Sequence, residues 1–434
     1  MSQLPRYESY KDSGVQWLGE IPSHWYVTRL KFILAVKKNA IKVGPFGSDL
    51  KGDDFQTSGY PVYNQRTVLD NNFIDGTAFI SEEKFKDLSG FKIEPLDILV
   101  TTRGTIGKIA VAPKDVNDGI IHPCIMKFSI NRGAVTEKLL KYLFNEIDYV
   151  FNQFVLASGT TTIPVIYSDT LKNIVLPLPP ITEQKIIAEF LDKRLAQVDA
   201  LIAKQEILLE KLAEQRVALI SHAVTKGLNP DVEMKESGVE WLGKVPKSWD
   251  IANLRYFISC NSGDALESSR ILRDADEFNN IPVIGGNGLL GFTENSNYKK
   301  ECIAVGRVGA LCGNVHFIDY ESWINDNALL IKLISDKFNI NYLVYLLRSR
   351  NLNELASKTA QPLLTGTQVK AEKVCIPLMS EQLEIVRYLD TNLETLDKLH
   401  ETVNKTIQTL REYRSTLITQ VVTGKIDVRN LKLN

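Results

Sequence analysis

The sequence predicts an α+β protein built as a pseudo-twofold internal repeat, in which two globular α/β domains are separated by two long coiled-coil helices. Residues 11–25, KDSGVQWLGEIPSHW, return at 235–249 as KESGVEWLGKVPKSW, with 9 of 15 positions identical. Residues 183–225 align without a gap to 381–423, with 15 identities. Repetition of this kind is the signature of a duplicated architecture. We therefore expect a domain at 1–180, a helix at 181–229, a second domain at 230–377 and a second helix at 378–434.

Each globular domain opens with the shorter repeat, in which tryptophans stand at matching places. Trp17 and Trp25 in the first copy correspond to Trp241 and Trp249 in the second. We interpret them as anchors that fasten each domain to a helix end. Stacking on nucleic-acid bases is the alternative, and repetition in the constant part of the chain disfavours it.

The interiors of the two domains differ in sequence. Residues 26–180 and 250–376 both alternate short β-rich runs, such as DILVTT and IAVGRV, with turn signals and helical stretches. This alternation predicts an α+β fold for each segment. The two segments do not match each other closely, so the constant parts of the chain bracket variable ones.

The longer repeat predicts two helices, because apolar residues recur at steps of three, four or seven. The seam keeps the same phase in both copies, which indicates coiled-coil packing. At 1.5 Å per residue each helix would span about 60 Å, with Gly227 and Gly424 placed as stops. The expected helix-packing residues are Ile187, Leu191, Leu195, Val198, Leu212 and Leu219 in the first helix, and Ile385, Leu389, Leu393, Leu396, Leu410 and Leu417 in the second.

Two glycine-bounded turns project basic side chains from between apolar strands. The run ILVTTRGTIGKIAV carries Arg103 and Lys108, and CIAVGRVGALCGNVHF carries Arg307. Such loops suit phosphate or base-edge contacts, while a solvated hairpin with an incidental arginine is the alternative. The stretch GTIGK lacks the spacing and the hydroxyl of a phosphate loop, so we exclude nucleotide binding there.

Further loops are rich in Asn, Gln and Thr, whose side chains can hydrogen-bond to base edges. Asn and Gln pair bidentately with adenine, and Arg pairs with guanine. Taken singly, each of these residues is better explained as an ordinary polar loop residue. The predicted DNA-binding set is Lys42, Lys51, Asn64, Gln65, Arg66, Arg103, Lys108, Thr160, Thr161, Asn287, Arg307, Asn314, Lys358 and Gln361.

Composition limits the chemistry of the chain. Its 51 Lys and Arg balance 52 Asp and Glu, so any phosphate-binding surface must be a local patch. The five cysteines are scattered without a CxxC pair, which indicates reduced core residues. We find no methyltransferase fingerprint and no compact nuclease cluster, and therefore expect no catalytic residue, no metal and no cofactor on this chain. No apolar run could cross a bilayer and no signal peptide opens the sequence, so we expect a cytoplasmic protein without membrane contacts.

Together these elements resemble the specificity subunit of a type I restriction-modification enzyme over the full length of the chain. The residues that carry the resemblance are SGVQWLGEIPSHW with SGVEWLGKVPKSW, VGPFGSDL, TTRGTIGK, and PLPPITEQKIIAEFLD with PLMSEQLEIVRYLD. The resemblance implies two target-recognition domains, each reading one half of an asymmetric, bipartite site in double-stranded DNA. It also implies that the two helices pack antiparallel and set the distance between the half-sites.

The same resemblance implies partners. The helices would dock two modification subunits, which would bring S-adenosylmethionine and adenine methylation. Restriction subunits would add ATP-driven, Mg-dependent translocation and cleavage.

Two other classes of function stay open. A structural hub would use its helices to assemble partners and its globular domains to bind protein, and a gel shift with bipartite DNA would separate it from a DNA reader. A self-sufficient nuclease or methyltransferase is disfavoured by the missing motifs, and cofactor binding by the purified chain would reveal it.

Overall fold

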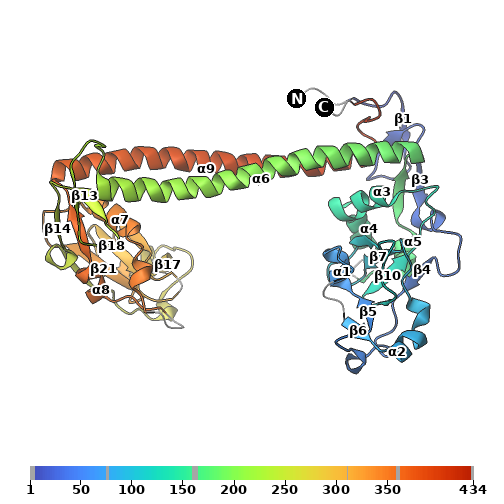
Figure 1. The fold of residues 1–434 in the computed structure, drawn as a ribbon, viewed down its shortest axis with the longest axis horizontal. Coiled ribbons are helices and arrows are strands. Elements are labelled where there is room, and N and C mark those ends of the chain that lie inside the picture. Colours follow the sequence, from blue (N-terminus) through green and yellow to red (C-terminus); the bar gives the residue numbers. More distant parts are fainter. Residues whose placement is uncertain (1–4, 75–77, 159–164, 310, 358–361, 432–434) are drawn as a thin grey trace. The chain divides into compact units, whose positions relative to one another are not determined.

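The computed structural model describes residues 5–74, 78–158, 165–309, 311–357 and 362–431. The chain divides into two compact units. Unit 1 comprises Met1–Lys204 with Thr406–Asn434, and unit 2 comprises Gln205–Lys405. Each long helix is therefore shared between the two units (Figure 1).

The two predicted helices are present, and both lie within the predicted ranges. Helix α6 covers Ile181–Lys226 and α9 covers Met379–Val422, which are 46 and 44 residues. At 1.5 Å per residue these lengths correspond to about 69 and 66 Å. Gly227 and Gly424 follow the helix ends with φ of +77° and +74°, the left-handed conformation that glycine supplies at a C-terminal cap. The predicted stops are confirmed.

Unit 1 holds two small sheets and two two-stranded ribbons. The four-stranded sheet has the order β4-β10-β7-β8 with antiparallel neighbours, and the three-stranded sheet has the order β6-β5-β9 with β5 and β9 parallel. The ribbons pair β1 with β2 and β3 with β11. The strands are β1 (Tyr10–Asp12), β2 (Glu20–Pro22), β3 (Tyr26–Arg29), β4 (Ile41–Val43), β5 (Tyr60–Tyr63), β6 (Ala78–Ile80), β7 (Ile98–Thr101), β8 (Ile109–Val111), β9 (Ile120–Ile121), β10 (Ile125–Phe128) and β11 (Val175–Leu178).

Short helices pack beside the sheets of unit 1. Helix α1 lies between β5 and β6 in the chain, and a π-helical turn at Tyr142–Glu146 follows α3 directly. The short helices are α1 (Gln65–Leu69), α2 (Glu82–Asp87), α3 (Glu137–Lys141), α4 (Tyr149–Ser158) and α5 (Ser168–Lys172).

Unit 2 repeats the strand order of unit 1. Its four-stranded sheet runs β15-β21-β18-β19 and its three-stranded sheet β17-β16-β20, with β16 and β20 parallel. The ribbons pair β12 with β13 and β14 with β22. The elements are β12 (Met234–Glu236), β13 (Lys244–Pro246), β14 (Asp250–Asn253), β15 (Ile258–Ser262), β16 (Ile281–Gly285), β17 (Gly288–Thr293), β18 (Cys302–Gly306), β19 (Val315–Ile318), β20 (Trp323–Ile324), β21 (Ala328–Leu333), α7 (Ile340–Ser349), α8 (Gly366–Ala371) and β22 (Lys373–Ile376).

Domain interiors that differ in sequence thus share one topology. The connection after the middle strand of the three-stranded sheet distinguishes them. In unit 1, β5 leads into α1, whereas in unit 2 β16 turns directly into β17 with Gly285 opposite Gly288.

The expected helix-packing residues lie in the apolar cores. In unit 1, side chains from the start of α6 share a core with Leu417, Ile418 and Val421 of α9. In unit 2, Ala223 and Val224 of α6 share a core with the start of α9. Of the expected set, Leu219, Leu396 and Leu410 are half-buried, and the buried members are Ile187, Leu191, Leu195, Val198, Leu212, Ile385, Leu389, Leu393 and Leu417.

Two of the four predicted tryptophan anchors fasten a domain to a helix start. Trp25 and Trp249 are buried, and their Nε1–H groups donate to the carboxylates of Glu183 (3.0 Å) and Glu381 (2.8 Å).

Trp241 is half-buried against the core that contains Ala223 and Val224 of α6. Trp17 is 55% exposed, so burial does not support its role as an anchor. It lines a surface pocket instead.

Within the described ranges, no helix is both long and apolar enough to cross a bilayer.

Candidate nucleic-acid interface

In unit 2, three loops predicted to contact DNA meet. The Asn314 side-chain amide donates to Asn287 Oδ1 (3.2 Å), which joins the β18–β19 loop to the β16–β17 turn. The carbonyl of Arg307 accepts from the N–H of Leu364 (2.9 Å), which joins the same loop to the segment before α8. The fold therefore gathers Asn287, Arg307 and Asn314 from separate parts of the sequence.

Unit 1 gathers its loops in the same way. The carbonyl of Thr102 accepts from the N–H of Ile166 (3.0 Å). With its amide oriented to satisfy both ends, Gln65 donates to the Arg103 carbonyl (3.2 Å) and accepts from the N–H of Thr105 (3.1 Å). The Gln65 side chain thus braces the loop that carries Arg103.

Backbone hydrogen bonds align the two basic loops residue by residue. The N–H of Thr102 donates to Cys124 O (3.0 Å), and the N–H of Arg307 donates to Asn327 O (2.9 Å). Cys124 immediately precedes β10, which pairs with β7, and Asn327 immediately precedes β21, which pairs with β18. The two acceptors thus occupy matching places in the two units. Arg307 therefore corresponds to Thr102, and Arg103 is one residue further along its loop.

The two arginines are held differently. Arg103 is exposed and forms no salt bridge with any residue that the structure describes. Arg307 donates through Nη1 to Ser262 Oγ (3.0 Å) and to the Asp326 carbonyl (3.2 Å). Arg307 is thus fixed in place, with donors of its guanidinium remaining for a ligand.

Asn64 serves as the N-cap of α1. Its Oδ1 accepts from the N–H groups of Arg66 (2.9 Å) and Thr67 (3.3 Å), the usual role of Asn at this position. Arg66 in turn pairs with Asp70 (3.0 Å) on the exposed surface of the helix. Any contact of Asn64 with a base must therefore use its amide nitrogen.

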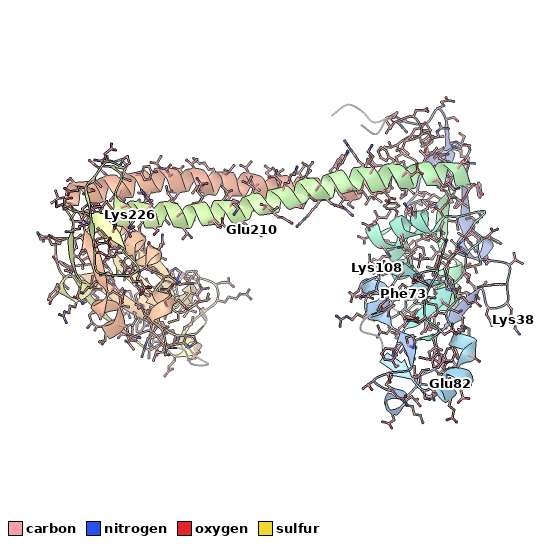
Figure 2. The ribbon with its side chains drawn as sticks, in the orientation of Figure 1. Lys38, Phe73, Glu82, Lys108, Glu210 and Lys226 are labelled. Atoms are coloured by element: carbon pink, nitrogen blue, oxygen red, sulfur yellow. The ribbon has the colours of Figure 1, made fainter. Side chains whose placement is uncertain are left out.

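Three of the four predicted lysines lie in the described ranges, and their surroundings differ. Lys108, labelled in Figure 2, lies in unit 1. Its Nζ donates to Asn145 O (2.8 Å). Lys42 Nζ lies over the Phe91 ring, 4.7 Å from its centroid, and Lys51 is exposed. Thr160, Thr161, Lys358 and Gln361 lie outside the described residues. The DNA contacts of all these residues stay predictions.

A repeated Glu-Gln dipeptide, which sequence reasoning did not single out, fastens each helix start. The Gln184 side chain accepts from the N–H of Thr136 (2.8 Å), and Gln382 accepts from the N–H of Asn339 (2.8 Å). Both glutamines are fully buried. The same two residues stand at matching places in both copies, and this repetition could have identified them from the sequence.

The glutamates of this dipeptide differ in environment. Glu183 is 4% exposed and accepts from Tyr7 Oη (2.6 Å) and Trp25 Nε1 (3.0 Å), with His24 Nε2 at 2.7 Å from its other oxygen. Glu381 is half-buried and bonds Trp249.

An ion pair joins the globular part of unit 1 to the helices. Arg414 of α9 contacts Asp199 of α6 (2.9 Å) and Glu146 of the π-helical turn (2.7 Å).

In the described part of unit 2, the arginine at the matching position pairs with a carboxylate of the other long helix but not with one of the globular part. Arg216 of α6 pairs with Asp397 of α9, but it faces Arg348 of α7 where unit 1 has a carboxylate. Burial and the nearby charge of Arg216 both lower the pKa of Arg348. These groups line a surface pocket of about 370 Å³.

The described residues hold no group of His, Cys, Asp and Glu side chains that could bind a metal ion. Burial raises the pKa of the Cys260 and Cys375 thiols to about 12, so they stay protonated at neutral pH. This agrees with their interpretation as core residues.

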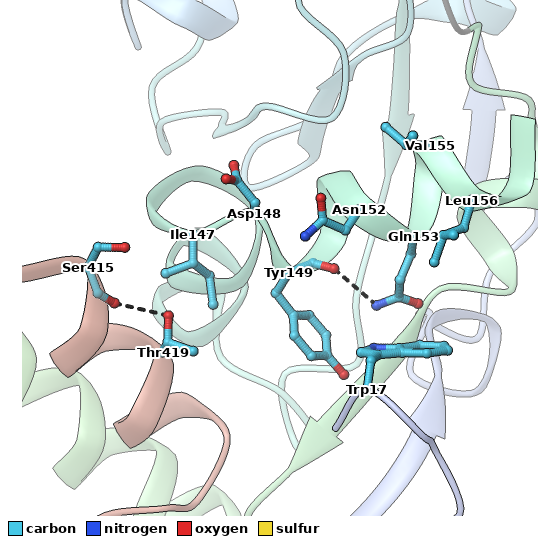
Figure 3. A pocket seen from close by; sticks show the side chains of 10 residues that line it. All are labelled: Trp17, Ile147, Asp148, Tyr149, Asn152, Gln153, Val155, Leu156, Ser415 and Thr419. Atoms are coloured by element: carbon cyan, nitrogen blue, oxygen red, sulfur yellow. Dashed lines mark hydrogen bonds between the residues drawn. The ribbon is translucent and has the colours of Figure 1, made fainter. Parts of the chain in front are cut away.

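Trp17 lines a pocket in unit 1 that has a volume of about 600 Å³ (Figure 3). Its other walls come from α4 and from α9, including Tyr149 and Thr419. Asp148 is the one ionisable carboxylate among the lining residues. The pocket thus offers an apolar surface and no pair of groups for acid-base chemistry.

Comparison with known proteins identifies relatives along nearly the whole chain. The family model described as type I restriction modification DNA specificity domain matches residues 22–211 and 246–409. The putative type I restriction enzyme MjaX specificity subunit of Methanocaldococcus jannaschii is 24% identical, with 98% of this chain and 99% of that protein aligned. The StySPI specificity subunit of Salmonella potsdam is 24% identical over 94% and 90% of the two chains.

Solved structures share the fold. A chain from a study of complex assembly and conformational transition of the type I R-M system aligns with a TM-score of 0.71 at 16% identity, covering 93% of this chain and 98% of that one. The HsdS subunit from Thermoanaerobacter tengcongensis aligns with a TM-score of 0.58 at 16% identity, covering 94% and 98%.

Proposed function

The chain belongs to the type I restriction modification DNA specificity family, and from this premise we propose that units 1 and 2 each read one half of a bipartite site in double-stranded DNA. It is a specificity subunit, the non-catalytic DNA-recognition component of a restriction-modification system.

One observation supports the proposal that the chain recognises two half-sites. Both units have the same strand order, yet different residues occupy the loops that gather beside the sheets. Like scaffolds with unlike loops fit two half-sites of unlike sequence, because base edges are read by individual side chains.

We further propose that α6 and α9 pack antiparallel and set the distance between the half-sites. Two ion pairs support this direction: Asp199 contacts Arg414 within unit 1, and Arg216 contacts Asp397 within unit 2. As the number rises along α6, the number of the partner on α9 falls. A helix pair of this kind acts as a spacer of fixed length.

The partners follow from the family. We propose that the helices dock two modification subunits carrying S-adenosylmethionine, and that restriction subunits supply the ATP- and Mg-dependent steps in the cytoplasm. The chain itself would bind no cofactor.

A domain exchange tests the proposal. Residues 26–180 are replaced by the matching segment of a relative, and the methylated sites are mapped by sequencing the DNA of a host that also expresses the modification subunit. One half of the target should change and the other should persist. The reciprocal exchange of 250–376 should change the opposite half.

Altered bases in both halves after a single exchange would contradict the proposal. Failure of the wild-type chain to shift any bipartite DNA, alone or with its modification subunit, would favour the structural hub instead.

A further inference from the structure

The tip of the β16–β17 hairpin in unit 2 displays two large apolar side chains. Leu289 is 57% exposed and Leu290 is 49% exposed. We define the tip as Leu289 and Leu290. Leu290 is the extra residue of a β-bulge, because Ile284 pairs with Leu289 and Val283 pairs with Gly291. A bulge interrupts the regular alternation of a strand and re-aims its side chains.

Glycines make this tip narrow. The run from Gly285 to Gly291 is GGNGLLG. Apart from the two leucines, Asn287 is its one residue other than glycine. A Cβ atom on Gly285 would lie 2.5 Å from Leu290 Cδ1, and Gly288 has a φ of +90°. Larger residues here would displace the leucine or strain the turn.

The apolar tip borders the polar groups predicted to contact DNA. Asn287 within the same turn accepts from Asn314, and Gly286 packs on the backbone of Gly306, the residue before Arg307. Leu311 of the adjoining loop is also exposed. Arginine and asparagine donors around an apolar point match the mixed surface of a DNA groove, in which phosphates and base edges flank stacked bases.

Unit 1 also exposes apolar residues near the corresponding strands. The connection from β5 to β6 carries Leu69 and Ile74, both exposed. In unit 2 the exposed leucines lie at the start of β17 itself.

Resting on the proposed function, we propose that the apolar tip of Leu289 and Leu290 inserts between adjacent base pairs of the half-site that unit 2 reads. Apolar wedges from minor-groove proteins unstack base steps in this manner. A contact with a thymine methyl group in the major groove is the alternative, and it would leave the base step stacked. Insertion buries the two leucines, and Arg307 and Asn287 hydrogen-bond to the neighbouring phosphates or base edges of the DNA.

The test uses the full chain assembled with its modification subunit, and DNA that carries 2-aminopurine at successive positions other than the methylated base. Wild-type protein should raise the fluorescence at one step of the second half-site. The Leu289→Ala/Leu290→Ala double variant should lose this rise and bind the site about tenfold more weakly.

Three controls accompany the measurement. Ile334→Ala removes a 62% exposed side chain just after β21, at the end of that strand away from the Arg307 loop, and should behave as wild type. Leu289→Met keeps an apolar side chain and should keep the fluorescence rise. The response in the first half-site should be the same in every variant.

An unchanged fluorescence rise in the double variant would overturn the wedge, as would wild-type binding without unstacking anywhere in the second half-site. Both outcomes leave sequence reading intact, whereas a wild-type assembly that binds no bipartite DNA would refute the proposed function itself.

Discussion

At the scale of single residues, the two glutamates that begin the repeated helices give the clearest contrast. Glu183 receives hydrogen bonds from three side chains in a buried site, while Glu381 bonds one tryptophan in a half-buried site. Removing a buried carboxylate leaves its former donors without partners, and the cost grows with their number.

We therefore expect Glu183→Ala to lower the free energy of unfolding by roughly 3–5 kcal/mol and Glu381→Ala by about 1–2 kcal/mol. Urea unfolding of the two variants beside wild type checks this. Equal losses would show that the hydrogen bonds of Tyr7 and His24 contribute little.

Arg103 and Arg307 give a second prediction. If the arginine reads a base, changing it to Ala should weaken binding by about 1–3 kcal/mol and remove the base preference at one position of its half-site. If it touches a phosphate, the slope of the logarithm of the binding constant against the logarithm of salt concentration should fall in magnitude by about one. Ser262→Ala removes one of the two hydrogen bonds that hold the Arg307 guanidinium and should give a smaller loss in the same half-site.

Salt titrations of binding to single-base variants of the target distinguish these outcomes. Wild-type affinity and specificity in both arginine variants would mean that the loops are structural.

Single residues also mark where sequence reasoning stops. The polar groups of Asn64 suit an adenine edge and a helix cap equally, and the structure uses its Oδ1 for the cap. Lys108 follows a glycine turn that predicts a projecting cation, yet its ammonium bonds the carbonyl of Asn145. The deciding neighbour lies 37 residues away in the chain, beyond any local pattern.

At the scale of elements, the long helices were predicted best. Their burial follows a period of seven that is visible directly in the sequence, because one face of a helix recurs at that spacing. The ion pairs beside the seam were not predictable, since Arg414 and Arg216 occupy the same position of the repeat and meet opposite charges in the globular parts.

This difference predicts unequal fastening of the globular part to the helices in the two units. Arg414→Ala removes contacts with Asp199 and Glu146 and should destabilise the docking of the π-helical turn by about 1 kcal/mol, a modest value because these groups are partly exposed. Arg216→Ala should leave α7 unchanged or slightly stabilised, since it relieves repulsion with Arg348.

Amide hydrogen exchange of residues 137–146 and 340–349 measures both effects. Faster exchange in α7 of Arg216→Ala, equal to that in the π-helical turn of Arg414→Ala, would contradict the contrast.

The spacer role of the helices gives the next prediction. Four residues inserted near Lys204, matched by four near Thr409 in α9, add about 6 Å and rotate the helix beyond each insertion by roughly 40°. The gap between half-sites should lengthen by about one or two base pairs at 3.4 Å each, while the bases read stay the same.

A two-residue insertion is the control, because it turns the seam by about 200° and exposes Leu209, Leu212 and Leu219. It should abolish folding or partner docking. Methylation of the original spacing at full activity by the four-residue variant would show that the helices are packing elements only.

At the scale of the whole molecule, the duplication could be predicted from the sequence because 9 of 15 residues repeat in one motif. The common strand order of the domain interiors could not be predicted, since strand pairing depends on a burial pattern and a backbone geometry that many sequences satisfy. Sequence reasoning also divided the chain into four consecutive segments. The compact units instead share each long helix.

The composition of the units has a consequence for synthesis. Unit 2 is one uninterrupted stretch, Gln205–Lys405, whereas unit 1 needs residues from both sides of it: Lys425 Nζ donates to Leu18 O (2.9 Å), and Asp427 N–H donates to Pro5 O (2.8 Å). On the ribosome, unit 2 has all of its residues before unit 1 does, although unit 1 starts first. The apolar side chains of unit 1 that pack against Leu417, Ile418 and Val421 therefore lack these partners through the translation of about two hundred residues, roughly 10–40 s at about 5–20 residues per second. A chain that ends before residue 406 would hold every residue of unit 2 and would lack the C-terminal part of unit 1.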